Sequence, residues 1–575
     1  MRHSRAFAVC GSAALVAAAL AGSAGVSSAS AEVVHTGTPQ QYVVLADSTS
    51  GSDHLAAELR SAGAKVTSVN KAIGMVVVSS DDANFRANTR TLSGVSGVAA
   101  NRSIGHTPQQ KVSVEKEHLT AARAGSTTAS APASTAAVAG PADPLDTKLW
   151  GMRMIKADEA HATSLGNAKV RVGVMDTGVQ ADHPDLQRNF DYTTSRNFVT
   201  DDPAIDGPCE YARCIDPVGV DNDGHGTHVA GTIAAALNGF GLSGVAPNAS
   251  VVEVRAGQDS GYFFLAPTVN ALTYSGDAGL DAVNMSFYVD PWLYNCRGGA
   301  KEDSPEAAAD QNTIIDAMTR ALDYAHGKGV TLVAATGNNH EDLAKPRHDF
   351  SSPDYGAAPY ERTIVNSKCF DLPVEGPNVL GITALGPSKT KADYSNYTSE
   401  PASGEVELSA PGGYFRDGLG TSTSRTNENL ILSTYPEGAL KASGQVDKNG
   451  RITKTGKAAG VIKQCQETAA PGTTACGFYA YLQGTSMATP HATGVAALLI
   501  GEHGSGASAA TFGYSPDQVR AQMLGTAQDT PCPNPPTVSY TDVGRSEEFT
   551  ATCVGTPQRN GFYGEGIVNA LGAVR

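Results

Sequence analysis

The stretch VRVGVMDTG at residues 170–178 indicates the fold class. An apolar run without the alternation of a half-exposed strand ends there at Asp176, and Gly178 permits a sharp turn. Similar runs occur at 251–254, 282–285 and 330–335, and stretches with helical spacing lie between them at 227–237, 268–278 and 313–326. The sequence therefore predicts an α/β fold, with a mostly parallel sheet and helices on both faces. Functional sites in such sheets lie at the carboxyl ends of the strands.

Two further motifs each begin an apolar helix. His225-Gly-Thr-His228 starts one, and Gly484-Thr-Ser486 starts another. A serine hydroxyl is a weak nucleophile unless an imidazole takes its proton, and a carboxylate then orients the imidazole. A lone Asp, His or Ser is usually structural, but here each lies in its own extended motif. Asp176, His225 and Ser486 are therefore candidates for a catalytic triad.

Four longer stretches surround these residues, namely MDTGVQADHPDL from 175, HGTHVAGTIAA from 225, VAATGN from 333 and GTSMATPHATGVAALL from 484. In these stretches the chain resembles the subtilisin family of serine endopeptidases. The resemblance implies hydrolysis of peptide bonds through an acyl-enzyme intermediate, with Asp176 orienting, His225 as base and acid, and Ser486 as nucleophile. His228 and His491 are expected to be structural.

The same resemblance suggests further site residues. Asn338 would donate to the oxyanion together with the Ser486 N–H. Gly261 and Ser286 lie in segments that would pair with an extended substrate. Phe287 begins Phe-Tyr-Val where the family usually has Leu-Gly-Gly, which predicts a narrowed or reshaped pocket for the residue before the cut.

Asp185 and Asn238 match calcium positions of the family, so a structural calcium ion is a hypothesis. No cofactor is expected for catalysis. Acidic residues number 57 and basic residues 42, which disfavours nucleic acid and membranes as partners. We expect a monomer that acts on polypeptides.

Residues 1–31 have the pattern of a secretory signal peptide, with Arg2 and Arg5, an apolar run and Ala29-Ser-Ala31. The run is too short to cross a bilayer as a helix. The sequence thus predicts a secreted, extracellular protein.

Residues 40–106 show a βαββαβ order, a small ferredoxin-like α+β unit that resembles the family's inhibitory propeptide. A permanent accessory domain is the other interpretation. Residues 107–146 are expected to be a linker with the processing site, because much of this segment is small and polar. The peptidase domain would cover 147–575, with surface insertions near 290–312, 339–360 and 414–480.

Nine cysteines are present, and Cys10 would leave with the signal peptide. The other eight permit 105 disulfide pairings. Neighbour order suggests Cys209 with Cys214, Cys296 with Cys369, Cys465 with Cys476, and Cys532 with Cys553. A zinc site is a less favoured use of these thiols because no second close pair lies near Cys209 and Cys214.

Two other functions stay open at this point. A secreted peptide-binding protein without turnover would explain the departure at Phe287 if bulky residues and insertions blocked the cleft. The serine-carboxyl peptidases share a Gly-Thr-Ser nucleophile motif but use Glu where His225 stands.

Overall fold

The computed structural model describes residues 35–101, 116–117, 140–345, 347–354, 357–467 and 474–575. The predicted signal peptide and most of the predicted linker lie outside the described residues. None of the helices in the described ranges combines the length and the apolar character needed to cross a membrane.

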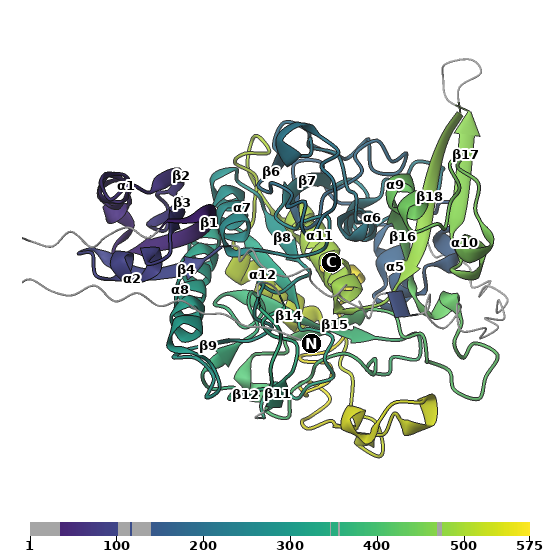
Figure 1. Cartoon of the computed structure of the whole chain (residues 1–575). Coiled ribbons are helices and arrows are strands. Elements are labelled where there is room, and N and C mark those ends of the chain that lie inside the picture. Colours follow the sequence, from purple (N-terminus) through teal and green to yellow (C-terminus); the bar gives the residue numbers. More distant parts are fainter. Residues whose placement is uncertain (1–34, 102–115, 118–139, 346, 355–356, 468–473) are drawn as a thin grey trace, which may run out of the picture.

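The N-terminal unit is a four-stranded antiparallel sheet with two helices (Figure 1). Its strands lie in the order β2-β3-β1-β4, and the chain order is βαββαβ as predicted. Leu55, Leu59 and Phe85 of the helices pack on one face of the sheet. Val43 and Val77 on the other face join the core beneath helices α7 (Leu265–Asp277) and α8 (Pro305–Gly327). The elements are β1 (His35–Ala46), α1 (Ser52–Ser61), β2 (Lys65–Asn70), β3 (Met75–Asp82), α2 (Phe85–Arg90) and β4 (Val95–Ala100).

The main domain is built on a seven-stranded sheet whose ladders are all parallel. The strand order is β15-β14-β10-β8-β5-β7-β6. Four of these strands were predicted, whereas β6, β14 and β15 were not. The bounds are β5 (Arg171–Met175), β6 (Arg196–Asn197), β7 (Ser250–Arg255), β8 (Ala282–Met285), β10 (Thr331–Ala335), β14 (Val379–Leu385) and β15 (Leu408–Pro411).

Helices cover both faces of this sheet, as predicted (Figure 1). α6 (His225–Ala234) and α11 (Thr485–His503) share one core with β14 and β15. α7 (Leu265–Asp277) and α8 (Pro305–Gly327) share the other core with the N-terminal unit. α11 is buried from Thr485 to Ile500, so the helix that carries Ser486 runs through the centre of the molecule.

The expected insertions hold more regular structure than their sequences suggested. Within 414–480 lie a second sheet, in the order β16-β18-β17, and two short helices. Buried Leu432 and Leu440 from this region join the core of α6 and α11. α8 begins at Pro305, inside the first expected insertion, because the Ser304 hydroxyl accepts from the Ala307 N–H and caps the helix. The elements of the second sheet region are β16 (Ile431–Tyr435), α9 (Glu437–Ala442), α10 (Lys454–Ala458), β17 (Ile462–Glu467) and β18 (Thr474–Leu482).

The remaining elements are short apart from one helix. They are α4 (Trp150–Met154), α5 (Ala157–Ala160), β9 (Asn295–Cys296), β11 (Arg347–Asp349), β12 (Arg362–Ile364), β13 (Cys369–Phe370), α12 (Pro516–Thr526), β19 (Thr537–Val538), β20 (Ala551–Thr552) and α13 (Ala570–Ala573), with isolated 3-10 turns between them.

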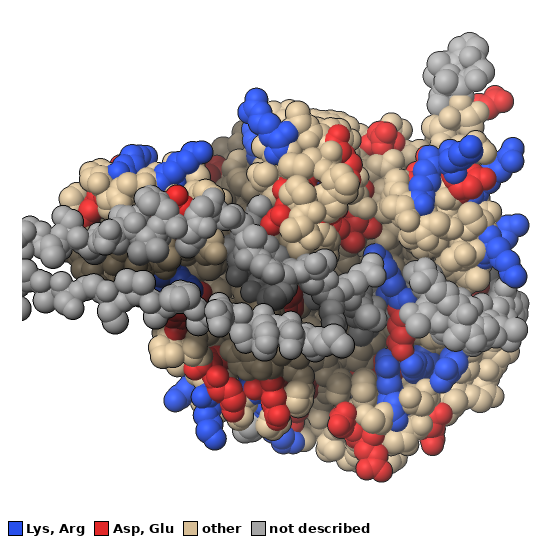
Figure 2. Space-filling model, in the orientation of Figure 1, with Lys and Arg blue, Asp and Glu red and all other residues tan. Residues whose placement is uncertain are grey.

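The four disulfide pairs predicted from neighbour order are confirmed. Cys465 and Cys476 face each other across β17 and β18, and Cys296 and Cys369 across β9 and β13. On the face shown in Figure 2, basic and acidic side chains of the described residues are interspersed.

Candidate active site

Asp176 and His225 meet at the carboxyl end of β5. Asp176 follows the last residue of the strand and is fully buried, and His225 is the first residue of α6. The His225 Nδ1 lies 2.8 Å from the Asp176 Oδ1, which also accepts from the Thr177 N–H at 2.8 Å. With the Nδ1 proton bound to the carboxylate, the Nε2 atom is the one available as a base.

A buried carboxylate that sequence analysis missed, Asp221, orders the loop before His225. It accepts from the Thr177 hydroxyl at 3.0 Å, from the Gly224 N–H at 2.9 Å and from the Thr227 N–H at 2.9 Å. Burial raises the pKa of Asp221. Gly224 has φ +103°, and a Cβ there would lie 2.5 Å from the Tyr435 ring, so this position requires glycine.

Ser486 lies in the first turn of α11 and is buried. Its hydroxyl donates to the Ser286 carbonyl at 3.3 Å, and the Ser286 hydroxyl donates to the Ser486 carbonyl at 3.1 Å. Asn284 donates to the Ser286 hydroxyl at 2.9 Å. The end of β8 therefore fixes the start of α11 and places Ser286 beside Ser486.

Asn338 follows β10 and lies against the same helix start. Its Oδ1 accepts from both the N–H and the hydroxyl of Thr485, each at 2.9 Å. These two bonds fix the plane of the amide and turn its NH₂ group away from Thr485. A helix N-terminus also favours negative charge nearby. The Asn338 amide is thus held against the residue that precedes Ser486.

Phe287 lies flat against Phe263, with ring centroids 4.0 Å apart and an interplanar angle of 4°. The Asp290 N–H donates to the Phe263 carbonyl at 2.9 Å, so the two segments expected to pair with substrate are joined. Gly261, with φ +83°, closes a turn by donating to the Gln258 carbonyl. At the two glycine positions of the Leu-Gly-Gly pattern stand Tyr288, whose hydroxyl donates to the Asp354 carboxylate, and buried Val289, so side chains occupy volume that the glycines would leave open.

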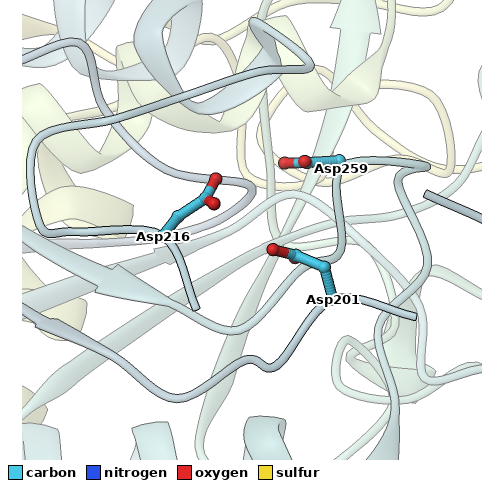
Figure 3. Close-up of side chains that lie close together, drawn as sticks. All are labelled: Asp201, Asp216 and Asp259. Carbon is cyan, nitrogen blue, oxygen red and sulfur yellow. The ribbon is translucent and has the colours of Figure 1, made fainter. Parts of the chain in front are cut away.

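Three aspartates, Asp201, Asp216 and Asp259, lie close together (Figure 3). The guanidinium of Arg255, at the end of β7, binds all three. Its Nη1 lies 2.7 Å from Asp216, and its Nη2 lies 2.9 Å from Asp201 and 2.9 Å from Asp259. Burial raises the pKa of Asp201 and of Asp259.

These carboxylates could form a metal site by distance alone, but the guanidinium already supplies the cation. The Asn222 amide donates to Asp216 and to Asp259, so the cluster connects the His225 loop to the Gly261 segment. Sequence analysis missed this cluster because Asp201, Asp216 and Asp259 are separated along the chain.

The surroundings of Asp185 do not fit the calcium site suggested by the resemblance. Its carboxylate accepts from the Leu242 N–H at 3.1 Å, from the Tyr479 hydroxyl at 2.8 Å and from Asn238 at 3.4 Å. Burial raises the pKa of Asp185 to about 7. Calcium requires several oxygen ligands, whereas hydrogen-bond donors surround this carboxylate.

His228 and His491, which were predicted to be structural, contact backbone carbonyls. The His228 Nε2 lies 3.0 Å from the Ile431 carbonyl, and burial lowers the pKa of His228 to about 3. The His491 Nδ1 lies 2.8 Å from the Met487 carbonyl, and burial lowers its pKa to about 4. Both rings are held neutral in the core, in agreement with the structural role predicted for them.

Solved structures of serine proteases share this fold. The epidermin leader peptide processing serine protease from Staphylococcus aureus aligns with a TM-score of 0.56 and 19% identity, covering 93% of this chain and 98% of that one. Fervidolysin from Fervidobacterium pennivorans aligns with a TM-score of 0.51 and 20% identity, over 94% of this chain and 62% of that one.

Sequence comparison defines the family. The family model described as "Subtilase family" matches residues 167–566, well over half of the chain. Subtilisin DY from Bacillus licheniformis is 26% identical over 66% of this chain and 90% of its own length. Thermitase from Thermoactinomyces vulgaris is 26% identical over 67% and 91%. The chain belongs to the subtilase family and is a subtilisin-type serine peptidase.

Proposed function

We propose that Asp176, His225 and Ser486 are the catalytic triad of a secreted endopeptidase made as a propeptide-inhibited zymogen. The observation that carries the proposal is the 2.8 Å contact between His225 Nδ1 and Asp176, which leaves the Nε2 atom to take a proton. The Ser486 Oγ attacks the substrate carbonyl carbon, and its proton moves to the His225 Nε2.

The tetrahedral oxyanion then accepts hydrogen bonds from the Asn338 amide and the Ser486 N–H. His225 gives its proton to the leaving amine, and an acyl-enzyme remains. Water, deprotonated by His225, hydrolyses the acyl-enzyme and regenerates the Ser486 hydroxyl. Asp176 keeps the imidazole in one tautomer and stabilises its cation throughout.

Two features support the zymogen part of the proposal. The sheet of the N-terminal unit packs on α7 and α8, and Asn101, just after β4, accepts from the Ala266 N–H at 2.8 Å. The N-terminal residues expected to direct export support secretion. If the proposal is right, N-terminal sequencing of the secreted form will place its first residue within 107–146.

The central experiment uses a fluorophosphonate probe and casein digestion on the processed protein. We expect the probe to label Ser486 and casein to be cut, and the substitution Ser486→Ala to abolish both. Ser422→Ala, at an exposed hydroxyl, is the matched control and should change neither. A processed protein that takes no label and cuts no casein would instead be the peptide-binding protein without turnover.

A further inference from the structure

Two arginines and a glutamine converge on one point close to Ser486. Arg416 lies in the loop after β15, Arg545 in the C-terminal segment and Gln483 three residues before Ser486. The buried Asp393 carboxylate binds the Nε of Arg545 and lies 3.7 Å from the Nε of Arg416. The Gln483 Oε1 accepts from the Phe415 N–H at 2.7 Å. These bonds leave the Nη2 atoms and the Gln483 amide pointing at a common position.

A carboxylate of the chain itself occupies that position. Arg416 Nη2 binds the Glu117 Oε1, and Arg545 Nη2 lies 2.9 Å from the Glu117 Oε2. The Gln483 amide donates to the same Oε2 at 3.2 Å. Three donors from three separate segments thus bind one side chain, and the side chains of Glu117, Arg416 and Arg545 are only 22%, 14% and 16% exposed.

Lys116 and Glu117 together contact segments that precede two of the proposed catalytic residues. The Lys116 Nζ is 3.6 Å from Asp223, which accepts from the His225 N–H at 3.0 Å. Lys116 thus lies beside the loop of the base, and Glu117 beside the loop of the nucleophile. The two residues therefore contact both sides of the candidate site, as a bound polypeptide would.

The charges explain why the site requires an anion. Arg416 and Arg545 carry two positive charges, and Asp393 balances one of them. Removal of Glu117 would leave one partly buried positive charge without a partner, which is costly in a low-dielectric environment. A carboxylate held by two guanidinium groups makes strong, charge-assisted hydrogen bonds.

Chain direction assigns the site to one side of the bond that is cut. Asn101 is held at the start of α7, next to the Phe263 and Phe287 pair, and Glu117 is held at Gln483. A substrate whose chain runs in the direction from Asn101 to Glu117 would place next to Gln483 a residue that follows the scissile peptide bond.

We propose that Arg416, Arg545 and Gln483 form a subsite that binds an acidic side chain, Asp or Glu, on the leaving-group side of a polypeptide substrate. Glu117 fills this subsite in the precursor. The inference rests on the proposed function and adds a substrate class to it.

The test compares the cut sites of processed wild-type enzyme and variants in a peptide library analysed by mass spectrometry. For the wild type we expect Asp and Glu to be enriched about tenfold over Asn and Gln at one of the first three positions after the cut. The double variant Arg416→Gln/Arg545→Gln should lose this enrichment. The control Arg297→Gln, in an exposed ion pair with Asp316, should keep it.

Fluorophosphonate labelling of Ser486 verifies that each variant has folded. If the double variant fails to fold, the proposal can still be tested, because the cut sites of the wild-type enzyme alone can contradict it. Cleavage without acidic enrichment, or enrichment that survives in the labelled double variant, would overturn the subsite and leave the proposed function standing. Absence of labelling and of all cleavage would overturn the proposed function itself, and the subsite with it.

Discussion

In its proposed role as oxyanion donor, Asn338 would be a side chain prepared for a charge that is not yet present. Its oxygen is bound twice by Thr485, so the amide cannot rotate freely toward other partners. Preorganised donors of this kind stabilise a developing oxyanion without reorganisation during the reaction.

We therefore expect Asn338→Ala to lower kcat by about 10² to 10³ with little change in KM, a magnitude carried over from subtilisin itself. Asn339→Ala is the neighbouring control and should stay near wild type. Steady-state kinetics on one peptide substrate measures both. An equal loss in the two variants would contradict the assignment of Asn338 as the donor.

Glu253 is a buried carboxylate that the proposed chemistry does not use. Its Oε2 accepts from the N–H groups of Gly219 and Val179, and burial raises the pKa of Glu253 to about 8. The folded state therefore binds a proton more tightly than the unfolded state. The stability that this proton provides is complete below the ordinary glutamate pKa and is lost as pH rises toward about 8.

Glu253→Gln should remove this dependence. The free energy of unfolding of the wild type should fall between pH 5 and pH 8.5 by on the order of 3 kcal/mol more than that of the variant. Urea unfolding in a Ser486→Ala background, which avoids self-digestion, measures the difference. Glu502→Gln, at an exposed site, is the control, and equal slopes for wild type and Glu253→Gln would contradict the account.

The sequence predicted those site residues that lie in contiguous motifs. Asp176, His225 and Ser486 each follow or begin an element that the pattern itself marks. Asp221 and Arg255 escaped prediction because their roles depend on partners that only the folded chain brings together. The arginines around Glu117 come from segments without any motif.

At the scale of elements, the second sheet supports the helix that carries His225. The Ser433 hydroxyl donates to the His228 carbonyl and the Thr434 hydroxyl to the Thr227 carbonyl, each at 2.7 Å. The sequence between 414 and 480 did not predict this second sheet. Its strands mix polar with aromatic residues, and glycine-rich turns separate them. Hydrophobic periodicity predicts which face of an element is buried, but it does not predict which distant element packs against that face.

The disulfides should differ in their contribution according to the length of chain that they close. Cys296 and Cys369 are 73 residues apart, whereas Cys209 and Cys214 are 5 apart. Chain-entropy estimates give about 4 kcal/mol for the first and about 2 kcal/mol for the second. Paired Cys→Ser variants, unfolded in urea in the Ser486→Ala background, should show this order. A larger loss from the Cys209 and Cys214 pair would contradict the prediction.

At the scale of the whole molecule, a close fit joins the N-terminal unit to the main domain. Gly97 of β4 lies against α8, and a Cβ there would meet the Thr313 Oγ1 at 2.6 Å. Arg320 of α8 donates to the carbonyls of Ala46 and Ile73. Asp310 binds Arg86 and Arg90.

Gly97→Ala should weaken this docking by about 1–3 kcal/mol, because the new methyl group overpacks the contact. In full-length Ser486→Ala protein, added trypsin should then digest the N-terminal unit faster than in the parent. Adding Thr313→Ala should restore part of the protection by making room. Unchanged digestion of Gly97→Ala would show that the contact does not limit release.

The N-terminal unit and the parallel sheet were predicted more accurately than the residue limits of the insertions. The βαββαβ unit and the parallel sheet follow from repeated local patterns, each of which specifies an element. The extent of the expected insertions was not predictable in the same way, because a strand such as β14 is recognised as part of the sheet only by its neighbours β10 and β15.

Arg255 holds the His225 loop and the Gly261 segment together with a charge that belongs to the chain itself. A bound ion obeys mass action, so its hold on a protein weakens when the ion is diluted or sequestered. The guanidinium is part of the chain, and its local concentration at Asp201, Asp216 and Asp259 is fixed by the backbone. The connection between the His225 loop and the Gly261 segment is therefore independent of the supply of divalent cations around the protein.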